Sequence, residues 1–104
     1  MRRDKRKKLE EAGWRVGGAA ELLELSPEEA EYVELRIRLG DAVRQLRKEK
    51  ELTQVELAAR MGSSQSRVAK AEAADTSISL DLLIRSFLAL GATRQDLARA
   101  IAGG

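Results

Sequence analysis

The chain has 104 residues and a net charge of +2, and it contains neither cysteine nor histidine. This length is enough for one domain built around one hydrophobic core. Without cysteine there are no disulfides or thiolate metal sites, and without histidine the commonest general base and metal ligand are missing. The composition therefore argues against an enzyme, and we expect no catalytic residue, no cofactor and no metal site.

No apolar run approaches the roughly 20 residues that a membrane-spanning helix needs. The basic N-terminus also lacks the apolar segment of a signal peptide. The absence of cysteine is also consistent with the cytoplasm, so we expect a cytoplasmic protein with no membrane partner.

Charge is distributed unevenly along the chain. The first eight residues carry six Lys or Arg against Asp4, whereas residues 9–34 carry eight Glu against Arg15. The balance is basic again from Arg36 to Lys70. Such blocks indicate separate surfaces for separate partners, although ordinary solvated faces would give the same pattern.

Helix-forming residues dominate the sequence, and proline occurs once. This composition predicts an all-α fold. Residues 1–8 are expected to form a flexible basic arm, residues 9–40 a helical N-terminal extension, and residues 41–104 a compact helical domain. The apolar residues of the extension, Trp14 among them, need burial within the chain, across a dimer or against a second protein.

A long helix is predicted to begin at Ser26-Pro27-Glu28-Glu29, where Ser26 is the cap and Glu29 reaches back to it. Apolar residues then recur at three- and four-residue spacings, which marks one helical face. They are Tyr32, Leu35, Leu39, Ala42, Val43 and Leu46. Residues 33–39 also alternate as a strand would, but the helical spacing continues through Gly40. Gly40, with Asp41 as a cap, is a candidate joint between two helices.

Four shorter helices follow, each with clear start signals. They are expected over Thr53–Gly62, Ser64–Ala73, from Ser79 or Leu80 to Gly91, and from Thr93 onward. The loops between them are short, so the helices are expected to pack as a compact bundle.

Residues 53–72 have the pattern of a helix-turn-helix unit, whose second helix enters the major groove of DNA. Leu57 and Ala58 are predicted to face inward from the first helix, and Val68 and Ala71 from the second. The small side chain of Ala58 lets the two helices approach closely. The outward face of the second helix then holds Gln65, Ser66, Ala69 and Lys70.

These outward side chains suit base edges and phosphates. Gln65 can bind adenine through its amide, Ser66 can pair with several bases, and Lys70 can reach guanine or a phosphate. Arg67 lies to one side and is expected to meet a phosphate. A solvent-exposed polar helix face with no role in DNA binding would have the same residue types. The complete helix-turn-helix pattern of residues 53–72 is what favours DNA binding.

The segments Leu52–Ala58 and Gly62–Glu72 resemble the Xre family of helix-turn-helix regulators, which shares its domain with lambdoid phage repressors. The resemblance covers about Asp41–Ile101 and implies a compact five-helix lambda-repressor-like domain. It implies that Gln54 binds phosphate at a helix N-terminus. It also implies a structural ion pair between Arg47 and Glu72.

Two positions depart from the pattern of the family. Ser63 stands where the turn commonly has an apolar residue, and Ala74 where a glycine commonly follows the recognition helix. The turn after Glu72 is therefore a place where the shape of the chain can differ from that of the family.

The preferred function is sequence-specific binding of double-stranded DNA as a transcriptional repressor. One recognition helix contacts too few bases for useful specificity, so we expect a homodimer on a palindromic operator, with Leu97 and Ile101 as interface candidates. The predicted DNA-binding residues are Gln54, Ser64, Gln65, Ser66, Arg67, Lys70, Arg44 and Lys48.

Two alternatives stay open. Residues 75–92 resemble, less specifically, HigA-type antitoxins, which would make the chain an antitoxin that binds a cognate toxin and represses its own operon. The acidic N-terminal extension could instead serve a protein-interaction module.

Overall fold

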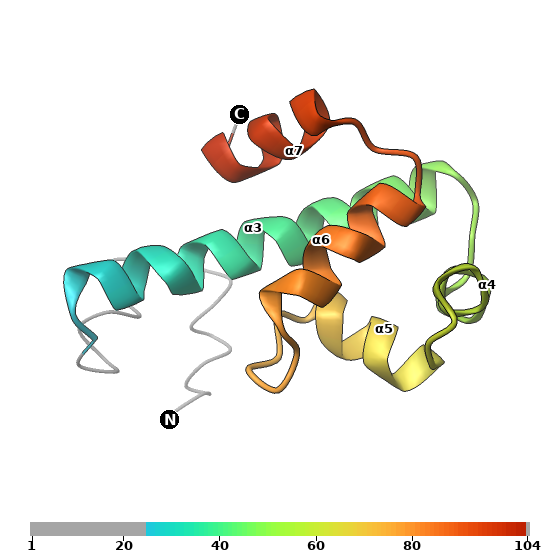
Figure 1. Cartoon of the computed structure of the whole chain (residues 1–104), viewed down its shortest axis with the longest axis horizontal. Coiled ribbons are helices and arrows are strands. Elements are labelled where there is room, and N and C mark those ends of the chain that lie inside the picture. The colour runs from blue at the N-terminus through green and yellow to red at the C-terminus, as the bar shows by residue number, and fades with distance from the viewer. Residues whose placement is uncertain (1–24, 104) are drawn as a thin grey trace. The chain divides into compact units, whose positions relative to one another are not determined.

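The computed structural model describes residues 25–103 (Figure 1). The basic arm and the extension up to residue 24, including Trp14, lie outside the described residues. The chain divides into two units, residues 1–35 and residues 36–104. Of the first unit the structure describes residues 25–35, which hold the start of a long helix.

The described residues form five helices and no strand. The helices are α3 (Pro27–Glu49), α4 (Gln54–Met61), α5 (Gln65–Glu72), α6 (Leu80–Ala89) and α7 (Arg94–Ala102). The predicted all-α fold is therefore confirmed. Among these helices, none is both long enough and apolar enough to cross a membrane.

Helix α3 starts at the predicted cap and runs without a break past Gly40. The joint expected at Gly40 and Asp41 is therefore not formed. A Cβ atom on Gly40 would lie 2.9 Å from the carbonyl oxygens of both Ala71 and Glu72. The glycine thus serves close packing of α3 on the end of α5.

The apolar face predicted for α3 is only partly buried. Leu39 and Val43 are fully buried, Ala42 and Leu46 are half-buried, and Tyr32 is exposed. Tyr32 belongs to the first unit.

Helices α4 and α7 start where the sequence predicts, and each start is a capping box. Thr53 Oγ1 accepts from the Glu56 N–H at 3.0 Å, and the Thr53 N–H donates to Glu56 Oε1 at 2.7 Å. Thr93 and Asp96 repeat this exchange at the start of α7. Gly62 ends α4 in the left-handed conformation, with a φ of 65°. These local signals place the helix ends within a residue or two of the predicted limits.

The core of the second unit is drawn from α3, α4, α5, α6 and the residue that follows α6. Its buried members are Val43, Leu57, Ala58, Val68, Phe87 and Leu90. Burying one such large apolar side chain contributes about 1.5–3 kcal/mol. Helices α4, α5 and α6 contact one another, and in Figure 1 α6 crosses α3 while α5 and α7 lie on opposite sides of it. Helix α5 is thus held in one orientation by its neighbours.

Candidate nucleic-acid interface

Helices α4 and α5 are joined by a tight turn. The Ser63 N–H donates to the Ala58 carbonyl at 2.9 Å, and Ser64 Oγ accepts from the Arg67 N–H at 3.2 Å. Val68 and Ala71 of α5 are fully buried. The inward face of α5 is therefore fixed, and its opposite face is left to the solvent.

The outward face of α5 is polar and cationic. Its exposed side chains, together with the cap, are Ser64, Gln65, Ser66, Arg67 and Lys70. The acidic residue of this helix, Glu72, is buried and paired. The face therefore presents hydrogen-bonding groups and two positive charges without a negative one, which suits a phosphate-lined groove.

The side chains that begin α4 and α5 are bonded to each other. Gln65 Nε2 donates to Gln54 Oε1 at 2.6 Å, and Gln54 Nε2 donates to Glu72 Oε1 at 3.0 Å. Each of these bonds uses one of the two N–H groups of a primary amide. Hydrogen bonds within the protein thus orient the two glutamines, and the bond between them was not expected from the sequence.

A buried ion pair lies behind these glutamines. Arg47 donates to Glu72 through Nε at 2.5 Å and Nη2 at 3.1 Å, and its Nη1 donates to the Leu52 carbonyl at 2.7 Å. The hydrogen bond with Glu72 raises the pKa of Arg47 above its usual value, against the opposing effect of burial. One guanidinium therefore ties α3, the α3–α4 loop and α5 together.

Arg44 and Lys48 are exposed on α3. They flank Arg47 in the sequence, three residues before it and one after it, and they add two positive charges to this end of α3. Of the predicted DNA-binding residues, Gln54 and Gln65 are joined by a hydrogen bond between their side chains, and Ser64 and Arg67 by the hydrogen bond of the helix cap.

A second buried arginine was not among the predicted residues. Arg36 Nη2 donates to the carbonyls of Asp75 at 2.6 Å and Ile78 at 2.5 Å. The spacing of Arg36 in the sequence could have indicated that it faces α5, because Arg36, Gly40 and Arg47 share one face of a helix.

The comparison with protein families agrees with this geometry. The family HTH_3, described as Helix-turn-helix, matches residues 43–97, more than half of the chain. No curated protein and no solved structure matches the chain significantly. The matched residues contain all of α4, the turn and α5, and the fold is lambda-repressor-like. The chain belongs to the helix-turn-helix family HTH_3, a family of DNA-binding regulators.

Proposed function

We propose that the chain is a sequence-specific transcriptional repressor that inserts the N-terminal half of α5 into the major groove of double-stranded DNA. The observation that carries this proposal is the hydrogen bond between Gln65 and Gln54 on an otherwise exposed, cationic surface. A polar face without a function gains nothing from holding a long glutamine side chain in one orientation, because the ordering costs side-chain entropy.

The groups presented by the start of α5 match base edges. Once Gln65 Nε2 has donated to Gln54, its amide has a second N–H to donate and an oxygen to accept, the pair that adenine recognises through N7 and N6. Ser66, the next residue, has a hydroxyl that serves several bases, and Lys70 lies within reach of guanine or a phosphate. In this proposal Gln65 and Ser66 read sequence.

The remaining positive and polar groups would position the protein on the DNA backbone. Arg67 flanks the reading face, and Arg44 and Lys48 extend the positive charge onto α3. Ser64 and Gln54 stand at the first turns of α5 and α4, where the helix dipoles favour a phosphate. The second N–H of the Gln54 amide supplies a donor for that contact.

A homodimer on a palindromic operator completes the proposal, since a single α5 spans few base pairs. Of the two interface candidates on α7, Leu97 is half-buried and packs against the core, whereas Ile101 is 44% exposed. Ile101 therefore offers the more accessible apolar surface for a second copy.

The test is a binding-site selection with the full chain on random duplexes, followed by affinity measurements at several salt concentrations. We expect one palindromic motif, an affinity that falls steeply with salt, and two protein chains per site. A promoter overlapping that motif should be repressed in a reporter assay. Equal affinity for all duplexes, with no selected motif, would rule out a sequence-specific regulator.

A further inference from the structure

Arg36 is a buried cation in a part of α3 that precedes the family match. Its relative exposure is 7%, and its guanidinium donates to two backbone carbonyls, those of Asp75 and Ile78. Both carbonyls belong to the loop that connects the recognition helix α5 to α6. Arg36 thus spans 39 residues of sequence to hold that loop.

The loop is built by backbone bonds that continue from the end of α5. The N–H groups of Ala74 and Asp75 donate to the carbonyls of Ala71 and Lys70, which closes the last turn of the helix. Asp75 Oδ1 then accepts from both the N–H and the hydroxyl of Ser77, and these bonds hold the pKa of Asp75 below its usual range. Backbone hydrogen bonds thus connect this loop directly to the C-terminal turn of α5.

Three contacts connect one face of α3 to this end of α5. Arg47 binds Glu72, Gly40 passes under the carbonyls of Ala71 and Glu72, and Arg36 binds the loop beyond them. Arg47 and Gly40 act on the helix itself, whereas Arg36 is the contact that holds the chain after the helix has ended.

We propose that Arg36 is a positioning residue for DNA recognition, which fixes the C-terminal end of α5 through the α5–α6 loop without touching DNA. The inference rests on the proposed function and adds a residue upstream of the matched region to its machinery. Arginine suits this role because its planar guanidinium can serve two carbonyls at once. Loss of the loop would leave a buried charge without these acceptors, so the held state of the loop is strongly favoured.

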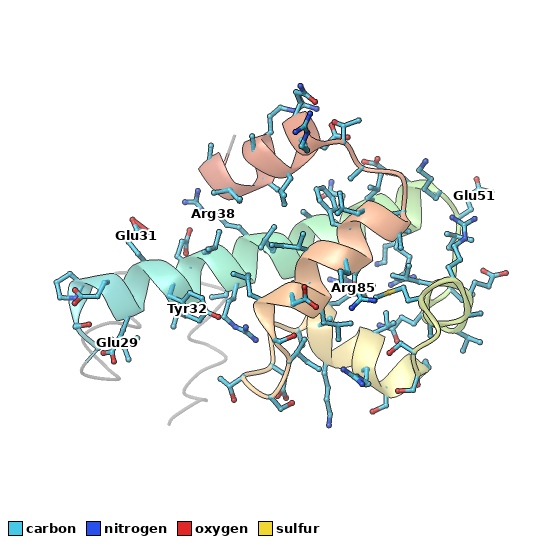
Figure 2. All side chains as sticks on the ribbon, viewed as in Figure 1. Glu29, Glu31, Tyr32, Arg38, Glu51 and Arg85 are labelled. Atoms are coloured by element: carbon cyan, nitrogen blue, oxygen red, sulfur yellow. The ribbon has the colours of Figure 1, made fainter. Side chains whose placement is uncertain are left out.

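The experiment compares Arg36→Gln with Arg85→Gln in the full chain. Arg85 is exposed on α6, where Figure 2 labels it, and pairs there with Asp81, so its replacement removes the same charge without affecting the loop. Amide hydrogen exchange is measured on α5 and on residues 73–79, and affinity is measured for the selected operator and for a random duplex at several salt concentrations.

We expect Arg36→Gln to speed exchange at the end of α5 and in the loop, and to lower the ratio of operator to random-duplex affinity by about tenfold, since hydrogen bonds from a charged donor are lost. The salt dependence should stay unchanged because Arg36 meets no phosphate. Arg85→Gln should leave the exchange and the ratio as in the wild type. Arg36→Lys keeps the charge and should restore part of the ratio, and it serves as the test if Arg36→Gln does not fold.

Two results would overturn the proposal. An unchanged operator ratio in Arg36→Gln and in Arg36→Lys would show that the loop bonds do not affect recognition. Equal weakening on all duplexes, with a salt slope smaller by about one, would make Arg36 a phosphate contact. If the wild type selects no duplex, the proposed function fails and the positioning role fails with it, while the exchange data still report whether Arg36 holds the loop.

Discussion

Arg47 on α3 and Glu72 at the end of α5 form a buried ion pair, with Nε and Oε2 2.5 Å apart. The same carboxylate accepts from Gln54 at 3.0 Å, and Gln54 accepts from Gln65. The side chain at the start of the recognition helix is therefore linked, through two hydrogen bonds, to the carboxylate at the end of it. Under the proposed function, stability and DNA recognition share this network, and changes in it should affect both.

Glu72→Ala should lower the free energy of unfolding by about 3–5 kcal/mol, because it leaves the Arg47 guanidinium buried without its partner. Chemical denaturation measures this loss. The matched control is Asp81→Ala, which breaks the exposed pair with Arg85 and should cost about 0–1 kcal/mol. A loss below about 1 kcal/mol for Glu72→Ala would mean that the buried pair stabilises the fold no more than a surface pair does.

Gly40→Ala should reverse the usual effect of such a change. In the middle of a helix this substitution commonly stabilises by about 0.5–1 kcal/mol. Here the added methyl would meet two carbonyl oxygens at 2.9 Å, so α3 and α5 must separate, and we expect a loss of about 1–3 kcal/mol. Gln45→Ala, on the exposed side of the same helix, should stay within about 0.5 kcal/mol in the same denaturation experiment. A stabilised Gly40→Ala variant would contradict the close packing.

The helix limits around the site could be predicted because their causes are local. A hydroxyl at Thr53 or Ser64 binds an N–H three residues later, and Gly62 takes up the left-handed conformation that ends a helix. Each of these signals is complete within four residues. The inward and outward faces of α5 followed from the same short-range periodicity.

The contacts that fix α5 in place could not be predicted in this way, because their partners are distant in the sequence. Arg36 acts on residues 39 and 42 positions away, and no periodicity indicates which carbonyls a buried arginine will meet. Gly40 was interpreted as a joint between two helices because the local sequence around a helical glycine is the same whether the glycine allows a bend or a close contact with another helix. The pairing of Arg47 with Glu72 was expected from the family resemblance alone.

Ala74→Gly should stabilise the protein. Ala74 adopts a φ of 57°, in the left-handed region where a side chain costs about 1–2 kcal/mol. Glycine removes that cost but is more disordered in the unfolded chain, so we expect a net gain of about 0.5–1 kcal/mol. Ala73→Gly is the matched control, since Ala73 has a φ of −88° and should lose about 0.5–1 kcal/mol. If thermal or chemical unfolding shows Ala73→Gly to be more stable than Ala74→Gly, the backbone strain assigned to Ala74 is contradicted.

Ser63→Ala should also stabilise the protein. The hydroxyl oxygen of Ser63 is buried in the turn and has no hydrogen-bond partner within residues 25–103. An unsatisfied buried hydroxyl costs about 1–3 kcal/mol, so its removal should raise the free energy of unfolding by about 1 kcal/mol. Ser66→Ala, exposed on α5, should change it by no more than about 0.5 kcal/mol. A less stable Ser63→Ala variant would show that the hydroxyl makes a favourable bond.

Gln65→Ala and Arg67→Ala should separate base reading from phosphate binding. Gln65 is oriented by Gln54 at the start of α5, so its loss should cost about 1–3 kcal/mol on the selected operator and relax the preference at one base pair. Arg67 is exposed at the side of the same helix, so its loss should weaken all duplexes similarly and reduce the salt slope by about one.

A repeated binding-site selection and a salt titration on both variants measure these effects. Gln54→Ala gives a third reading, because it removes the acceptor that orients Gln65 while leaving Gln65 itself in place. We expect it to weaken the same base preference that Gln65→Ala relaxes, since a glutamine free to rotate reads adenine less well. If Gln54→Ala instead weakened all duplexes equally and left the base preference intact, Gln54 would act on phosphate alone and the orientation of Gln65 would not depend on it.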